Sequence, residues 1–203
     1  MRTAHKINDK LVCIETEQKI VQRVWDIQDE TEIDKEPQNG SFVQYYPSGI
    51  IAVKGQYENE KMQGTWEYYH GNGEIKNRFA VKNGIMDGPY IEYNEAGIEI
   101  AKGQYKDGKK DGEWTWRYET GELKEIGNYK DDILHGPYIA YYKNGNVREK
   151  GKYAKGKLHG EYSTYFADGT DRARGTNVNG KARRITVKSN LDTIIQQLTN
   201  QTK

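Results

Sequence analysis

The chain has 203 residues, of which only 34% are hydrophobic, and its mean hydropathy of -1.02 gives little material for a compact aliphatic core. The 16 tyrosines and 22 glycines instead suit β-hairpins joined by tight turns. Lys and Arg number 31 against 30 Asp and Glu, and a net charge of +1 is too balanced for non-specific attraction to nucleic acid or to an anionic membrane.

The N-terminal residues carry no targeting signal that can be recognised. Met1–Lys10 has no apolar stretch of signal-peptide length, and no segment approaches the ~20 apolar residues of a membrane span. We therefore expect a soluble, cytoplasmic protein. The single cysteine, Cys13, lies in the apolar run 11–14 without a neighbouring histidine, which predicts a buried structural thiol rather than a nucleophile.

Residues 1–39 form a predicted N-terminal cap. Alternating side chains over residues 21–27 favour strands that continue a sheet, although the apolar positions 20, 21, 24 and 25 also fit one face of a helix. Residues 26–36 are acidic and are predicted to be a linker. Such a cap would cover the open edge of a sheet, which otherwise invites aggregation.

Residues 40–183 contain six repeats of 24 residues, marked by three sets of glycines. The first set is Gly40, Gly64, Gly88, Gly112, Gly136 and Gly160. The second set follows nine residues later, at Gly49, Gly73, Gly97, Gly121, Gly145 and Gly169. The third set is Gly55, Gly103, Gly127, Gly151 and Gly175. This period predicts an array in which each unit packs only against its neighbours.

An aromatic residue stands two positions after each first glycine. These residues are Phe42, Trp66, Tyr90, Trp114, Tyr138 and Tyr162. Their common position predicts a structural ladder of stacked rings across adjacent hairpins. The Asn-Gly pairs at 72–73, 83–84 and 144–145 are typical of two-residue hairpin turns. The predicted fold is mainly β: a single elongated, twisted antiparallel sheet of about six stacked β-hairpins.

Residues 184–203 are predicted to form a C-terminal capping segment with a short amphipathic helix. Ser189 to Asp192 resembles a capping box, and apolar residues at 191, 194, 195 and 198 would share one helix face. That face would pack over the last hairpin or dock to a partner. Basic residues gather near this end, at Arg172, Arg174, Lys181, Arg183, Arg184 and Lys188. They are either solvated charges or a site for head-to-tail association or an acidic ligand.

Candidate binding residues are those that break the repeat, because specificity needs difference between units. They are Tyr68, His70, Trp116, Arg117 and Tyr118. Tyr, Trp and Arg are enriched at interface hot spots, which favours a protein-binding role. The alternative is that these side chains simply repack within the ladder.

No catalytic constellation is present in the sequence, so we expect a non-enzyme without cofactor. His135 and His159 occupy equivalent positions one repeat apart, and such positions lie ~10 Å apart on stacked hairpins. That spacing is too wide for one metal ion with bonds of about 2 Å, so we expect no metal site.

The segments 88–93 and 136–141, with the pattern Gly-Pro-Tyr-Ile-x-Tyr, resemble the MORN repeat, in particular its bacterial variant. The resemblance covers residues 40 to about 183. It implies a platform for protein interaction, and bacterial members are often classed as antitoxin or immunity-type proteins, which would make the partner a toxin. The alternatives are a structural protein that forms homo-oligomers through its ends, and a phospholipid-associated module. Net charge makes the membrane alternative the weakest.

Overall fold

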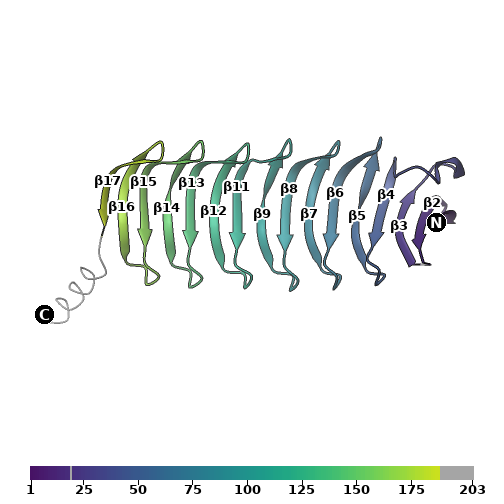
Figure 1. The fold of residues 1–203 in the computed structure, drawn as a ribbon, viewed down its shortest axis with the longest axis horizontal. Helices are drawn as coiled ribbons and strands as arrows, with labels where there is room; N and C mark the ends of the chain where they lie inside the picture. Colours follow the sequence, from purple (N-terminus) through teal and green to yellow (C-terminus); the bar gives the residue numbers. More distant parts are fainter. Residues whose placement is uncertain (19, 188–203) are drawn as a thin grey trace. The chain divides into compact units, whose positions relative to one another are not determined.

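The computed structural model describes residues 1–18 and 20–187, and these residues are mainly β-strand. They divide into two compact units, a first unit up to residue 109 and a second unit from residue 110. Within each unit the strands follow one another in chain order (Figure 1). The short strand β10 (Lys109–Lys110) falls at the division. The predicted C-terminal helix lies outside the described residues. Among the residues described, no helix is long and apolar enough to cross a membrane.

The first unit is a meander in which each strand pairs antiparallel with the next one along the chain. The three N-terminal strands are β1 (Arg2–Ile7), β2 (Lys10–Glu17) and β3 (Ile20–Asp26), followed by the 3-10 turn Glu30–Glu32. The remaining strands are β4 (Gly40–Tyr45), β5 (Ile51–Glu58), β6 (Lys61–Tyr69), β7 (Ile75–Lys82), β8 (Ile85–Tyr93) and β9 (Glu99–Lys106). Strands, rather than a helix, thus follow the alternation seen in the N-terminal sequence.

The second unit repeats the same arrangement. Its strands are β11 (Gly112–Arg117), β12 (Leu123–Lys130), β13 (Ile133–Tyr141), β14 (Val147–Ala154), β15 (Lys157–Tyr165), β16 (Asp171–Val178) and β17 (Lys181–Val187). Each strand again pairs antiparallel with the next. The prediction of a mainly β fold made of antiparallel hairpins is confirmed.

Two kinds of turn alternate along the meander. At Asn83-Gly84 both residues have positive φ, 52° and 82°, as a type I′ turn requires, and the prediction of a two-residue turn is confirmed there. The Asn-Gly pairs at 72–73 and 144–145 instead lie in longer connections, 70–74 and 142–146. In the first of these, the amide of His70 donates to Glu74 O at 2.8 Å. The prediction of two-residue turns at these two pairs is therefore wrong.

The first and third sets of glycines answer different physical needs. Gly136 of the first set lies inside β13 with a φ of 118°, a conformation that residues with a Cβ rarely adopt. Gly151 of the third set lies directly across from Tyr138 in the pairing of β13 and β14. A Cβ on Gly151 would lie 3.0 Å from Leu158 Cδ1. Because glycine has no side chain, the Leu158 side chain can pack against the backbone at this position.

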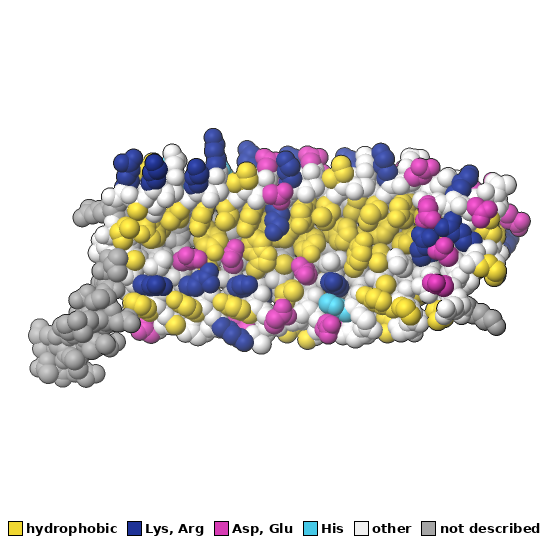
Figure 2. All heavy atoms as spheres, in the orientation of Figure 1, with side chains coloured by type: hydrophobic (Ala, Val, Ile, Leu, Met, Phe, Trp, Pro, Cys, Tyr) yellow, Lys and Arg dark blue, Asp and Glu magenta, His cyan; other side chains and the backbone are white. Residues whose placement is uncertain are grey.

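The ladder residues lie on one side of each unit, which we call the aromatic face. Trp66 and Trp114 are 2% and 1% exposed. The rings of Phe42 and Trp66 are 5.8 Å apart, and Tyr57 of the intervening strand contacts both, at 5.6 and 5.2 Å. Tyrosines of the second strands thus complete the ladder. Figure 2 shows hydrophobic side chains gathered in a central band, flanked by charged ones.

The N-terminal strands extend the core of the first unit. Cys13 is fully buried beside Trp25, and its Sγ donates to Ile33 O at 3.6 Å. Burial raises the pKa of this thiol. The prediction of a buried structural cysteine is confirmed.

Candidate functional site: a groove with charged side chains

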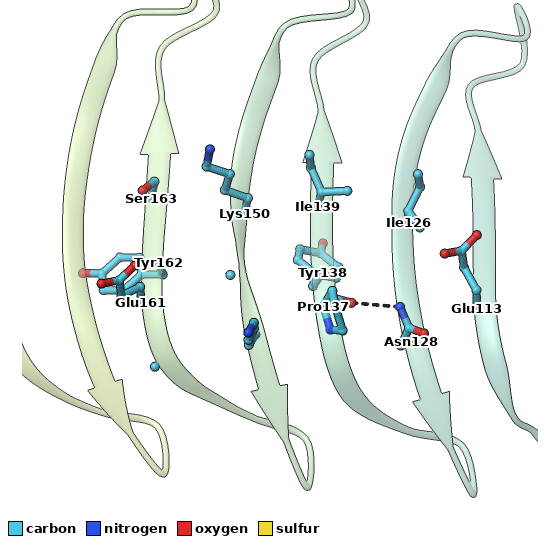
Figure 3. Close-up of a pocket in the computed structure, with 13 residues that line it drawn as sticks. Glu113, Ile126, Asn128, Pro137, Tyr138, Ile139, Lys150, Glu161, Tyr162 and Ser163 are labelled. Carbon is cyan, nitrogen blue, oxygen red and sulfur yellow. Dashed lines mark hydrogen bonds between the residues drawn. The ribbon is translucent and has the colours of Figure 1, made fainter.

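The candidate site lies on the side of the second unit opposite the aromatic face, which we call the outer face. Because side chains alternate along a strand, Pro137 and Ile139 point away from Tyr138 and onto the outer face. An open groove of about 890 Å³ crosses this face over β11 to β15. Figure 3 shows its side chains in two rows that run across the strands.

The first row of the groove runs along Ile126, Ile139, Lys150 and Ser163 (Figure 3). Cross-strand pairing fixes this order, since Ile126 pairs with Ile139, Ile139 with Lys150, and Lys150 with Ser163. Both isoleucines are half-buried and Lys150 is exposed. The row therefore changes from an apolar surface to a cationic one within three strands.

The second row mixes polar, charged and apolar groups. It contains Glu113, Asn128, Pro137, Lys152 and Glu161. The Asn128 side chain is held by a 3.3 Å hydrogen bond from Nδ2 to Pro137 O (Figure 3). Within the described part of the chain, no ion pair joins the charged side chains of this row. These charged side chains are therefore available to form ion pairs with a bound molecule.

Lys150 has a contact of its own that orients it. Its Nζ lies 5.6 Å from the ring centroid of Tyr165, at the end of β15, in cation–π geometry. Ser163 pairs on its other side with Arg174 of β16, so the hydroxyl lies between two basic residues. A second hollow next to the groove includes Ser163, Arg174, Thr176 and Thr186 in its lining.

The first unit carries a smaller hollow at the equivalent position, and its lining residues Lys54 and Glu67 belong to an ionic cluster. Glu67 on β6 receives bonds from Lys54 Nζ at 2.8 Å, Arg78 Nε at 2.7 Å and the Tyr69 hydroxyl at 2.7 Å. Burial alone would raise the pKa of the Glu67 carboxyl, but these three donors outweigh it and lower the pKa to about 2. Glu67 is 8% exposed and remains a buried anion.

Two of the predicted binding residues lie on the aromatic face. Tyr68 stacks on Phe79 at 5.6 Å. Trp116 stacks on Trp114, also at 5.6 Å, and Lys110 Nζ lies 5.1 Å from the Trp116 ring. Neither residue lines the groove. Their ring contacts are those of ladder members, and a binding role for them stays a prediction.

The other three predicted residues form hydrogen bonds close to the longer turns. His70 Nε2 lies 2.9 Å from Tyr93 O, and the Tyr118 hydroxyl donates to Tyr141 O at 2.8 Å. Tyr46 and Tyr142 make the same bond to the carbonyl 23 residues later. This position therefore links successive repeats. Arg117 Nη1 donates to Gly121 O at 3.2 Å within its own turn.

The structure thus does not assemble the five predicted residues into one site. The residues that line the groove were not predicted from the sequence, although the sequence contains a periodic signal for part of the groove. One position of the repeat holds Lys54, Arg78, Lys102, Ile126, Lys150 and Arg174. Basic side chains at five of the six copies of one outer-face position indicate a row of positive charge on this surface.

The groove has the chemistry of a binding surface. Across residues 1–18 and 20–187, no group of three or more His, Cys, Asp or Glu side chains could hold a metal ion. The groove offers cations, carboxylates, hydroxyls and an apolar floor. These groups can form ion pairs, hydrogen bonds and apolar contacts.

The period, the hairpins and the groove define a β-hairpin repeat scaffold. Residues 38–59, 110–131 and 134–155 match the family model described as MORN repeat variant. Three of the six repeats are thereby assigned, and the resemblance noted in the sequence is supported at the level of the repeat. No curated protein matches the chain. The match is to a repeat that generally serves as a non-catalytic module.

Proposed function

We propose that this protein is a non-catalytic scaffold that binds a protein partner along the groove of its second unit. The observation that carries the proposal is the composition of the groove. Ile126, Pro137 and Ile139 offer an apolar strip, while Lys150 and Glu161 offer charges of both signs beside it. An apolar centre with a polar border is the anatomy of a protein interface.

The mixture of charges favours a protein over a membrane. A surface that binds anionic lipid presents mainly Lys and Arg side chains, each contributing about 1 kcal/mol to the binding free energy near the membrane. Here Glu113 and Glu161 lie in the same groove as Lys150 and Lys152 and would oppose an anionic bilayer. Flotation with phosphatidylglycerol vesicles tests the phospholipid alternative, and binding of the folded protein to such vesicles would favour it over our proposal.

Site-specific cross-linking tests the scaffold proposal. A photoreactive amino acid at position 139 would report contacts in the groove, and one at the exposed position 130 would serve as the control outside its lining. In lysate of the source organism, we expect one protein to be captured from position 139 and not from position 130. The substitution Pro137→Arg, which places a long cation in the groove, should abolish that capture. Equal capture from both positions would contradict the proposal.

The narrower hypothesis, that the partner is a toxin which this protein neutralises, rests on the resemblance to bacterial repeat variants. The captured partner supplies its test. Expression of that partner alone should arrest growth, and co-expression of the scaffold should restore it. Normal growth with the partner alone would remove the antitoxin hypothesis and leave the scaffold proposal in place.

A further inference from the structure

The ionic cluster around Glu67 recurs four repeats later with its carboxylate missing. Lys54, Tyr69 and Arg78 hold Glu67 in the first unit. The residues 96 positions further on are, in the same order, Lys150, Tyr165 and Arg174, and Ser163 takes the place of Glu67. The three donor types are conserved within the chain, and only the acceptor is lost.

Strand pairing shows that this correspondence is also geometric. In the first unit Glu67 pairs directly with Lys54 on one side and with Arg78 on the other. In the second unit Ser163 pairs directly with Lys150 on one side. It pairs with Arg174 on the other side. The two sets therefore occupy the same register on the same face of equivalent hairpins.

The charges in the second set are available to a ligand. Among the described residues, Lys150 has no carboxylate within ion-pair distance, and its amine rests over the Tyr165 ring. Arg174 Nη2 contacts Asp171 Oδ1 at 2.7 Å, but the Arg174 side chain is 61% exposed. Exposed pairs of this kind contribute little and exchange partners readily. A carboxylate beside Ser163 would face two cations and a phenol.

Ile91 marks a third position of this type and shows why Ser163 differs. Arg78, Tyr93 and Lys102 surround it, but Arg78 is already bound to Glu67. The branched apolar side chain of Ile91 also occupies the space where an acceptor would lie. Ser163 is small, so the equivalent space in the second unit is open to solvent and forms part of the groove.

We propose that Lys150, Tyr165 and Arg174 form a receptor for one carboxylate side chain of the protein partner, which takes the place that Glu67 fills in the first unit. This inference rests on the proposed scaffold function and specifies its chemistry. The partner segment is acidic at one position, with apolar neighbours that contact Ile139 and Pro137. Two cations and a hydroxyl around a carboxylate give strong, directional bonds.

The substitution Ser163→Glu tests the receptor without a partner. The geometry around Glu67 shows that a glutamate fits this position, so the variant should fold. By nuclear magnetic resonance, the introduced carboxyl should titrate well below the ordinary pKa of about 4.3 for glutamate. An ordinary value would show that Lys150 and Arg174 do not act together on an anion, and would overturn the inference.

Ligand binding provides the second arm, with a capped tetraglutamate peptide as the probe. We expect it to shift the amide resonances of residues 150, 163, 165 and 174 in the wild type, and to bind S163E about tenfold more weakly because the site is already filled. Ser163→Gln, of the same size but uncharged, should weaken binding less than S163E. Equal loss in both variants, absence of binding, or binding of inorganic phosphate without the peptide would overturn the inference.

The two proposals fail in different ways. A partner that is cross-linked from position 139 and still binds S163E would leave the scaffold function standing and remove the carboxylate receptor. Peptide binding that S163E blocks, without any partner captured at position 139, would leave the receptor standing and remove the scaffold proposal.

Discussion

A methyl group on Gly55 would lie 2.3 Å from Cδ2 of Trp66, the ring that covers this glycine from the neighbouring strand. That distance is far below van der Waals contact, and Trp66 is 2% exposed and cannot move aside freely. The glycine is therefore part of the aromatic packing, because its missing side chain leaves the space that the indole fills.

The substitution Gly55→Ala is expected to lower the free energy of unfolding by about 1–3 kcal/mol, the usual range for an overpacked core. Gly71→Ala is the matched control, since a Cβ at Gly71 meets nothing within 4 Å and the backbone of Gly71 is not in the left-handed region. That change should be neutral or stabilising by about 0.5 kcal/mol. Urea unfolding of both variants gives the comparison, and equal effects would contradict the packing argument.

The sequence predicts the hairpins well because turns and packing depend on a few residue types at fixed spacing. Gly136 has a left-handed backbone conformation and Trp66 lies on the buried face, and the residue types glycine and tryptophan indicate these two properties. The longer turn at Asn72-Gly73 is harder to predict, since the same dipeptide also occurs in two-residue turns.

The groove as a whole could not be predicted from the same signals. One of its positions carries the periodic basic residues, but the chemistry of the groove depends on which strands are neighbours. The relation of Ser163 to Lys150 and Arg174 needs the register of three strands, which a single sequence does not provide. His70 and Tyr118 show the converse: they look like irregularities in the sequence, but they bond successive repeats.

The lowered pKa of Glu67 predicts a dependence of stability on pH. A carboxyl whose folded-state pKa is depressed to about 2 contributes stability that is fully present above its unfolded pKa of about 4.5. This contribution is lost as the pH falls through that window. Glu67→Gln should therefore be less stable than the wild type at pH 7, by on the order of 2–3 kcal/mol.

The difference between wild type and E67Q should shrink as the pH is lowered from 5 to 2, which urea unfolding at a series of pH values would show. Glu161→Gln is the control, because Glu161 is exposed and makes no ion pair in the described part of the chain. A gap between wild type and E67Q that stays constant with pH would mean that the Lys54 and Arg78 contacts do not stabilise the ionised form.

Tyr118 allows a structural role to be separated from a binding role. Its hydroxyl donates to Tyr141 O in the next repeat at 2.8 Å, so Tyr118→Phe should cost about 0.5–1.5 kcal/mol of stability. Capture of a partner at position 139 should be unchanged, since Tyr118 does not line the groove. Loss of capture with full retention of stability would instead support the binding role predicted from the sequence.

The type I′ turns provide a test of backbone strain. Four of the six repeats place glycine second in this turn, whereas Glu60 and Asp132 occupy that position with φ of 63° and 66°. A residue with a Cβ in this left-handed conformation costs roughly 1–2 kcal/mol. Glu60→Gly should therefore raise the free energy of unfolding, by about 0.5–1 kcal/mol after the greater entropy of glycine in the unfolded chain is subtracted.

Asp132→Gly relieves the same strain but removes a contact, which makes it the matched comparison. Asp132 Oδ1 accepts a 2.8 Å hydrogen bond from the amide of Lys110, and its loss costs about 1 kcal/mol. The two effects oppose each other, so D132G should change stability little, while E60G stabilises the protein. Thermal unfolding of both variants distinguishes these outcomes. Equal stabilisation by both substitutions would show that the Asp132 side chain does not stabilise its turn. Destabilisation by E60G would show that the left-handed conformation of Glu60 does not lower the stability of the protein.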